Sequence, residues 1–306
     1  METIKQLIKN KRPKLSKQSI NTYASILNSL NKKLFEGEEF DEENFENTEL
    51  IMEHLQSIPP NKRKTILSAL VIITDNKPYR DQMLEDIHDY NKEQHTQEMN
   101  ETQKQNWITG TDIDKQMSNY KKNINSAYKN IVDPDNNNTD KDLQLIQNYV
   151  ILSLYSGRFI PPRRSKDYVE FKIRNINKDE DNYMSGNTFV FNSYKTAKTY
   201  GQQVLEIPKE LKTILNKWIR VNPTDYLLFD TNRNQLTNVK LNQRLNKIFN
   251  GKKVGVNQLR HTYLTDKYQD TIDTNRNLDN DMRKMGSSTI QQKIYIKRHS
   301  LDDDSD

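Results

Sequence analysis

The chain has 306 residues, of which 33% are hydrophobic and 29% are charged, and its formal net charge is +5. This length allows two domains, each with its own core, and a pI of about 9.0 permits nucleic-acid binding without requiring it. The absence of cysteine excludes disulfides and cysteine-based metal sites, and the five histidines lack the spacing of a structural zinc site. No apolar run reaches membrane-spanning length and the N-terminus lacks a signal-peptide core, so we expect a soluble, intracellular protein.

Apolar residues at helical spacing predict three helices in the first 100 residues, beginning near residues 20, 61 and 79. The second of these helices carries Lys62, Arg63 and Lys64 in its first turn, where positive charge opposes the helix dipole. Because these cations gain little from their own helix, we expect them to contact an external anion, such as the phosphate backbone of a nucleic acid. A solvated basic surface is the alternative.

A polar stretch over residues 91–106 predicts a linker, and a second unit begins at Trp107. The patterns after it predict two helices, at about 111–125 and 140–156, and three strands, at 169–173, 188–191 and 204–207. Further helices follow from Pro208 and around residues 241–248, and the polar residues 270–281 predict a loop. The sequence thus predicts a mainly helical chain with a small β-sheet in its second half.

A basic segment joins the helix at 140–156 to the first predicted strand, with the sequence Ser-Gly-Arg-Phe-Ile-Pro-Pro-Arg-Arg-Ser-Lys-Asp. Its adjacent cations Arg163 and Arg164 follow a buried helix and need a partner for their charge, and Asp167 stands three residues after Arg164. Two more cations, Lys195 and Lys198, lie between the last two predicted strands. A lysine at such a connection is usually a solvated turn residue, which is the alternative for both.

Two motifs near the C-terminus carry groups suited to phosphodiester chemistry. The first is Asn257-Gln-Leu-Arg260-His261-Thr, and the second, Met-Gly-Ser287-Ser, is followed by Tyr295 among lysine and arginine residues. The planar donor fork of an arginine matches phosphate oxygens. A tyrosine hydroxyl can attack phosphorus and hold it covalently, which divides one difficult step into two reversible ones. Taken singly, each residue also fits an ordinary surface or packing role.

The two C-terminal motifs resemble those of the tyrosine recombinases, also called phage-type integrases. The family pattern is H-x-x-R-H-[ST], then an L-G-H-S-like element, then a nucleophilic tyrosine about nine or ten residues on. Asn257 stands where the first histidine is usual, and Ser287 stands where histidine or tryptophan is usual. Tyr295 lies at the expected distance.

Two earlier motifs of the same family also have counterparts, in the same order. The motif T-G-L-R-x-x-E-L resembles the basic segment, with its arginine at Arg164, or at Arg163 if the register shifts by one, and its acidic residue at Asp167. The β-hairpin motif K-T-x-K resembles the stretch between the last two predicted strands, with its lysine at Lys195, or at Lys198 as the alternative.

The resemblance implies a mainly α-helical fold with a small antiparallel β-sheet in the catalytic domain. It implies an N-terminal helical core-binding domain over residues 1–100 and a catalytic domain over residues 107–306. DNA contacts of the first domain would include the basic turn at Lys62, Arg63 and Lys64.

For function, the resemblance implies a site-specific DNA recombinase, the integrase of a virus or mobile element, acting through a 3′-phosphotyrosine without metal, ATP or other cofactor. The two arginines would clamp the scissile phosphate, Tyr295 would attack it, and Lys195 would protonate the leaving 5′-oxygen. His261 would position Arg260 or assist proton transfer. The partner would be double-stranded DNA, bound by a homo-oligomer that is a tetramer at the synapse, in the cytoplasm or in the nucleus of a eukaryotic host.

Two other functions remain open. One is a catalytically weak or inactive DNA-binding protein of the same fold, and the other is a type IB topoisomerase or resolvase-like enzyme. The departures at Asn257 and Ser287 each lose a charged donor or an acid–base group, so the enzyme is slower unless His261 and Ser288 compensate. Covalent capture of DNA separates the first alternative, and strand exchange between two duplexes separates the second.

Overall fold

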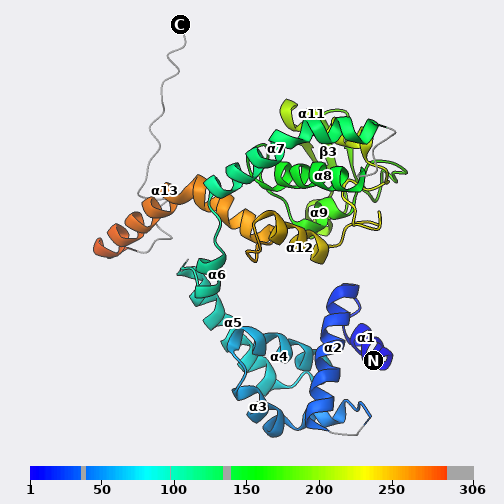
Figure 1. Ribbon diagram of the computed structural model, residues 1–306. Coiled ribbons are helices and arrows are strands. Elements are labelled where there is room, and N and C mark those ends of the chain that lie inside the picture. The colour runs from blue at the N-terminus through cyan, green and yellow to red at the C-terminus, as the bar shows by residue number, and fades with distance from the viewer. Residues whose placement is uncertain (36–38, 97, 134–138, 288–306) are drawn as a thin grey trace. The chain divides into compact units, whose positions relative to one another are not determined.

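The computed structural model of the chain describes residues 1–35, 39–96, 98–133 and 139–287 (Figure 1). The chain divides into two compact units, Met1–Asn100 and Glu101–Asp306. Each unit has a separate cluster of buried hydrophobic side chains. Within the described ranges, no helix is long and apolar enough to cross a membrane.

The described part of the first unit is helical. Its elements are α1 (Glu2–Lys11), α2 (Lys17–Leu34), the 3-10 helix η1 (Glu43–Glu46), α3 (Thr48–Gln56), α4 (Pro60–Thr74) and α5 (Lys77–His95). At the start of α2 the Ser16 side chain accepts a hydrogen bond from the Ser19 N–H, and Pro60 begins α4 with a preset φ. Inside the core, the Tyr79 hydroxyl donates to the Phe45 carbonyl at 2.8 Å. Capping and buried contacts therefore fix where these helices begin and how they pack.

The basic first turn of α4 is held partly by contacts inside the first unit. Arg63 donates two hydrogen bonds to the Asp86 carboxylate, at 2.9 and 2.6 Å, and both side chains are largely buried. The Nζ of Lys64 lies 3.0 Å from the centre of the Tyr90 ring, while Lys62 is exposed. The expectation that all three cations need an external anion is wrong for Arg63, because an acidic side chain of the same unit balances its charge.

The second unit combines helices with a small sheet. Its elements are α6 (Glu101–Asn106), α7 (Gly110–Val132), α8 (Thr139–Tyr155), α9 (Ser165–Val169), β1 (Phe171–Lys172), β2 (Asn182–Ser185), β3 (Thr188–Phe191), α10 (Ala197–Tyr200), β4 (Gln203–Glu206), α11 (Lys209–Val221), α12 (Asn238–Ile248) and α13 (Val256–Lys284). Every residue of α8 from 149 to 155 is buried, and α7 and α11 both pack against this helix (Figure 1). Helix α8 is therefore the centre of the second core.

The sheet has four strands in the order β1-β2-β3-β4. The pairs β2–β3 and β3–β4 are antiparallel, whereas β1–β2 is parallel. The sheet is therefore mixed, and the expectation of an antiparallel sheet is wrong for its first strand. Residues 165–169 form α9, so β1 is only two residues long. Residues 173–181 then connect β1 to β2, and they carry the chain back so that β2 runs in the same direction as β1. The strand predicted at 188–191 is confirmed as β3.

Helix α13 continues without a break through the region predicted as a loop. The prediction of a loop over residues 270–281 is wrong because polar composition alone does not end a helix. This stretch contains no glycine or proline, the residues that most disfavour helix. Its side chains also pair along the helix, as where Gln269 donates to the carboxylate of Asp273, four residues on.

Candidate functional site

A cavity of about 410 Å³ lies in the second unit, where the turn after α8, the β3–β4 pair and the start of α13 meet. Its lining includes three arginines, Arg163, Arg164 and Arg260, together with Asp167 and Gln203. We call this cavity the arginine pocket. The structure thus brings together arginines from both motifs that the sequence singled out.

The turn after α8 packs directly against α13. Gly157 has a φ of 76°, which glycine adopts without the steric cost of a side chain. A Cβ at this position would lie 2.3 Å from Cδ2 of Tyr263 on α13, so only glycine allows this approach. Pro161 and Pro162 then restrict the backbone and lead to Arg164, which is the N-cap of α9. This path carries the basic segment to the first turns of α13.

Arg163 forms part of the pocket wall. Its Nε donates to the Asp167 carboxylate at 2.8 Å and its Nη1 donates to the Gln203 side chain at 3.0 Å. Its guanidinium carbon lies 3.9 Å from the centre of the Phe191 ring. The side chains of Arg163 and Asp167 are only 15% and 5% exposed. Burial raises the pKa of Asp167, and the nearby charge of Arg163 opposes that rise. Arg163 is therefore fixed by partners within the unit.

Arg164 and Arg260 differ from Arg163 because their charges are not balanced in this way. The Arg164 side chain is exposed and the Arg260 side chain is half-buried. Within the described ranges, neither guanidinium forms a hydrogen bond or an ion pair. Glu206 also lines the pocket, but its side chain is exposed and forms no ion pair with a described residue. Since arginine stays protonated in proteins, the arginine pocket is net positive and offers free donors to an oxyanion.

Four other predicted residues lie near the pocket without lining it. Asn257 and His261 are exposed on the first turns of α13, within one turn of Arg260. Lys195 and Lys198 are exposed on the β3–β4 connection, and the residue after Lys195, Thr196, lines the pocket. The connection joins antiparallel strands, as the hairpin motif predicts. None of these four side chains lines the arginine pocket.

Ser287 lies at the opposite end of α13 from Arg260. The Ser287 N–H donates to the Met282 carbonyl at 2.9 Å, and Gly286 adopts a φ of 70°, which together form a Schellman-type helix end. Met285, Gly286 and Ser287 therefore end α13, and Ser287 does not line the arginine pocket. Ser288 and Tyr295 lie outside the described residues.

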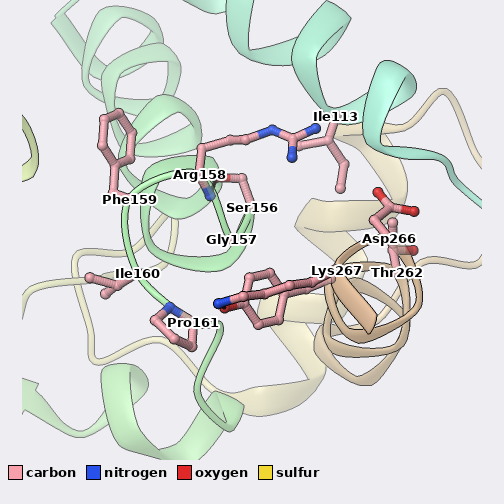
Figure 2. Close-up of a pocket in the computed structure, with 11 residues that line it drawn as sticks. Ile113, Ser156, Gly157, Arg158, Phe159, Ile160, Pro161, Thr262, Asp266 and Lys267 are labelled. Atoms are coloured by element: carbon pink, nitrogen blue, oxygen red, sulfur yellow. Dashed lines mark hydrogen bonds between the residues drawn. The ribbon is translucent and has the colours of Figure 1, made fainter. Parts of the chain in front are cut away.

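A second cavity, of about 440 Å³, adjoins the first, because Pro161 lines both. Figure 2 shows Lys267 of α13 pointing toward Pro161. The Lys267 Nζ donates to the Tyr263 hydroxyl at 3.1 Å. Arg158, on the other side of this cavity, pairs with Asp114 at 2.6 Å. The cations of the second cavity thus have partners in the chain, unlike those of the arginine pocket.

Two residues that shape the site were not anticipated from the sequence. Gln203 is the first residue of β4, and no local pattern pairs it with Arg163, forty residues earlier. Gly157 had a usable signal, because a glycine just after a buried helix is typical of a left-handed helix end. In the part of the chain that the structure describes, no group of three or more histidine, aspartate or glutamate residues could hold a metal ion.

No protein-family model and no curated protein matches the chain. Similar solved structures include a post-cleavage complex of XerH site-specific recombinase bound to palindromic difH substrate, with 15% identity and a TM-score of 0.47 over 83% of this chain and 69% of that chain. A pre-cleavage complex of XerH bound to difH substrate gives 12% identity and a TM-score of 0.40 over 87% and 83% of the two chains. XerA recombinase gives 11% identity and a TM-score of 0.34 over 87% of this chain and 83% of that chain. TM-scores below 0.5 do not establish a shared activity, so function has to be inferred from the residues of this chain.

Proposed function

We propose that this chain is a site-specific DNA recombinase that cuts and rejoins DNA through a tyrosine. One observation carries the proposal: Arg164 and Arg260, far apart in sequence, line one cavity, and neither has an acidic partner among the described side chains. Arg163, beside them, is already paired with Asp167. A scissile phosphodiester supplies the oxygens and the negative charge that the two free guanidinium groups lack.

Arg164 and Arg260 bind the non-bridging oxygens of the scissile phosphate in the proposed reaction. Charge on these oxygens increases as phosphorus becomes five-coordinate, so donors held in place stabilise the transition state more than the substrate. Asn257, one helical turn before Arg260, adds an uncharged donor. Because the usual histidine would add a charged one, we expect slower chemistry than in relatives with that histidine.

Tyr295 is the proposed nucleophile, on the strength of its distance from the motif at Ser287 and its basic neighbours Lys293, Lys297 and Arg298. Its oxygen attacks phosphorus, a 3′-phosphotyrosine bond forms and the bond from phosphorus to the 5′-oxygen breaks. One phosphoester replaces another, so rejoining needs no external energy source. Ser287 is assigned no contact with the phosphate, because it lies at the far end of α13 from Arg260.

Two proton transfers accompany this exchange. Lys195 donates a proton to the leaving 5′-oxygen, with Lys198 as the alternative donor on the same connection. The phenolic proton passes to His261 or to solvent, and His261 also positions Arg260, which it follows directly on α13. Support for the lysine assignment comes from Thr196, which lies between the two candidates and lines the arginine pocket.

The remaining assignments concern the assembly on DNA. We propose that residues 1–100 are a core-binding domain and that residues 107–306, within the unit that begins at Glu101, are the catalytic domain. Double-stranded DNA is the partner, and a homo-oligomer, a tetramer at the synapse, exchanges strands. Exposed Lys62 contacts backbone phosphate in the first unit. An integrase of a virus or mobile element is the biological role that the sequence resemblance suggests.

The test is covalent capture of DNA on a nicked suicide substrate, followed by a denaturing gel and mapping of the peptide that carries the nucleotide. An adduct that disappears in Tyr295→Phe supports the proposal, since this change removes one oxygen and keeps the ring. An adduct that persists in that variant, or a map pointing to Tyr263 or Tyr268, overturns the assignment. Absence of any adduct despite tight binding favours the non-catalytic alternative, and relaxation without strand exchange favours the topoisomerase.

A further inference from the structure

A third cavity, of about 230 Å³, lies between α8 and α12. Three of its lining residues, Lys240, Arg244 and Lys247, come from one side of α12, because residues three and four apart on a helix are neighbours. Gln144 and Asn148 line it from α8. We call it the α12 pocket. It shares no lining residue with the arginine pocket.

Among the described lining residues, the carboxylate of this pocket belongs to Asp230, and both of its oxygens already accept hydrogen bonds. One oxygen accepts from the N–H groups of Asn232 and Asn234, at 2.9 and 3.0 Å. The other accepts from the Nζ of Lys240 at 2.5 Å. The hydrogen bond from Lys240 is the main cause that holds the pKa of Asp230 below its usual value, and the two backbone N–H donors lower it further. Asp230 therefore pairs directly with Lys240 and acts on Arg244 only without direct contact, so among the described lining residues one carboxylate faces three cations, Lys240, Arg244 and Lys247.

Arg244 is partly buried, yet it forms no hydrogen bond or ion pair with a described residue. Its Nη1 is closed off from solvent without a hydrogen bond, as is Oδ1 of Asn148, and burial lowers the pKa of Arg244. A guanidinium nevertheless stays charged in a protein, and a buried charged donor without an acceptor is costly. A bridging water would satisfy both atoms, but it would leave the charge uncompensated. The second cation, Lys247, is exposed and forms no ion pair with a described residue.

We propose that the α12 pocket binds a phosphate group through Arg244 and Lys247. A phosphate supplies acceptors for both cations and the charge that balances them, and Gln144 and Gln243 add amide donors at the same cavity. The phosphate comes either from the backbone of bound DNA, away from the scissile position, or from a free phosphate compound. This binding requires no cleavage chemistry, so it holds whether or not the chain is a recombinase.

The experiment is a titration of the full chain with inorganic phosphate at constant ionic strength and pH, followed by the midpoint of thermal unfolding. An Arg260→Ala background removes one guanidinium from the arginine pocket, so that this pocket contributes less to the signal. A ligand that binds only the folded state raises the midpoint, and the stabilisation grows with the logarithm of one plus the ratio of free ligand concentration to Kd. Lys247→Gln should weaken phosphate binding several-fold. Arg244→Met, which keeps the side-chain volume and removes the charge, should weaken it about tenfold or more.

The matched control is Lys178→Gln, an exposed lysine of the same unit outside the pocket, and it should leave phosphate affinity unchanged. Equal affinity in Lys247→Gln and its parent, or an equal loss in Lys178→Gln, overturns the proposal. If Arg244→Met does not fold, Lys247→Gln decides, because its side chain has no structural partner among the described residues. A short DNA duplex then identifies the source. Weaker duplex binding in Lys247→Gln points to backbone phosphate, and unchanged duplex binding with lost phosphate binding points to a free compound.

Discussion

The Asp167 carboxylate accepts a hydrogen bond from Nε of Arg163 at 2.8 Å, whereas Arg164 forms no ion pair with any described acidic side chain. Because of this pair, Arg163 has a structural role whereas Arg164 is available to bind a ligand. Arg163 is held between Asp167, Gln203 and the Phe191 ring. Arg164 keeps its donors free at the same cavity.

Replacing Arg163 should therefore lower mainly the stability of the fold, and replacing Arg164 should lower mainly the rate of DNA cleavage. Arg163→Ala leaves the buried Asp167 carboxylate without its partner, and breaking such a pair costs about 3–5 kcal/mol of unfolding free energy. Arg164→Ala should change that free energy by at most about 0.5 kcal/mol, but slow cleavage by roughly a hundred- to a thousand-fold. Urea denaturation and the rate of adduct formation measure the two effects. A stable but inactive Arg163→Ala beside an active Arg164→Ala would show that the register is shifted by one residue.

The basic turn of α4 predicts a second contrast, between Lys62 and Arg63. Lys62→Ala should flatten the slope of log affinity for DNA against log salt by about 0.9, if its one charge contacts one phosphate. Arg63→Ala should instead lower the stability of the first unit, because buried Asp86 loses the two hydrogen bonds that Arg63 donates. Filter binding over a range of salt concentrations gives the slope. An unchanged slope and affinity in Lys62→Ala would assign this turn to a solvated surface.

Gly157 predicts an effect that combines a steric contact with a left-handed backbone conformation. Gly157→Ala places a Cβ in the ring of Tyr263 and forces a side chain into a left-handed conformation, so the turn after α8 must move away from α13. We expect about 1–3 kcal/mol of destabilisation and a loss of cleavage, since Arg164 moves relative to Arg260. Gly186→Ala is the control, because its φ is also positive but no atom lies within 4 Å of a Cβ there. Similar losses in both variants would assign the effect to backbone strain and not to the contact.

The capping box at α7 predicts a dependence of stability on pH. The backbone N–H of Thr109 donates to the carboxylate of Asp112, and this bond is the main cause that lowers the pKa of Asp112 from 3.8. A lowered pKa in the folded state means that this carboxylate stabilises the fold above pH 3.8, and that the contribution is lost as the pH falls through the folded pKa. Asp112→Asn should therefore be less stable than the parent at pH 7, with the gap closing in acid. A gap that is constant from neutral to acid pH would contradict this.

The sequence predicted helices and strands correctly where buried apolar residues recur at regular spacing along the chain. The periodic apolar residues that predicted α7 and α8 are those that fill the second core, and Thr188–Phe191 forms a strand because three of its four side chains are buried. It failed for β2, whose residues Asn182–Ser185 have no strong strand pattern and pair because their neighbours do. Strand pairing of that kind depends on contacts between distant residues, which no local pattern records.

In the candidate site, too, the residues that belong to sequence motifs were predicted, and the contacts set by the tertiary structure were not. The order of the motifs predicted that Arg164 and Arg260 belong together, and both line the arginine pocket. The pairing of Arg163 with Asp167 was not predicted, because it depends on which of two neighbouring side chains faces the buried ring of Phe191. The family motif placed Asp167 with Arg164, but in the structure the Asp167 carboxylate pairs with Arg163.

The unbroken length of α13 sets a limit on the reach of the proposed nucleophile. At 1.5 Å per residue, the helix carries its last residue, Lys284, roughly 36 Å along the axis from Arg260. The chain from Ser287, where the helix end closes, to Tyr295 spans at most about 26–29 Å when fully extended. With α13 intact, the Tyr295 hydroxyl can meet the arginine pocket of its own molecule only if the side chains of Tyr295 and of the pocket arginines make up the difference. A shorter α13, or the pocket of a second copy bound nearby, removes the constraint, so crosslinking Tyr295 to Arg260 in mixed dimers would tell which molecule supplies each group.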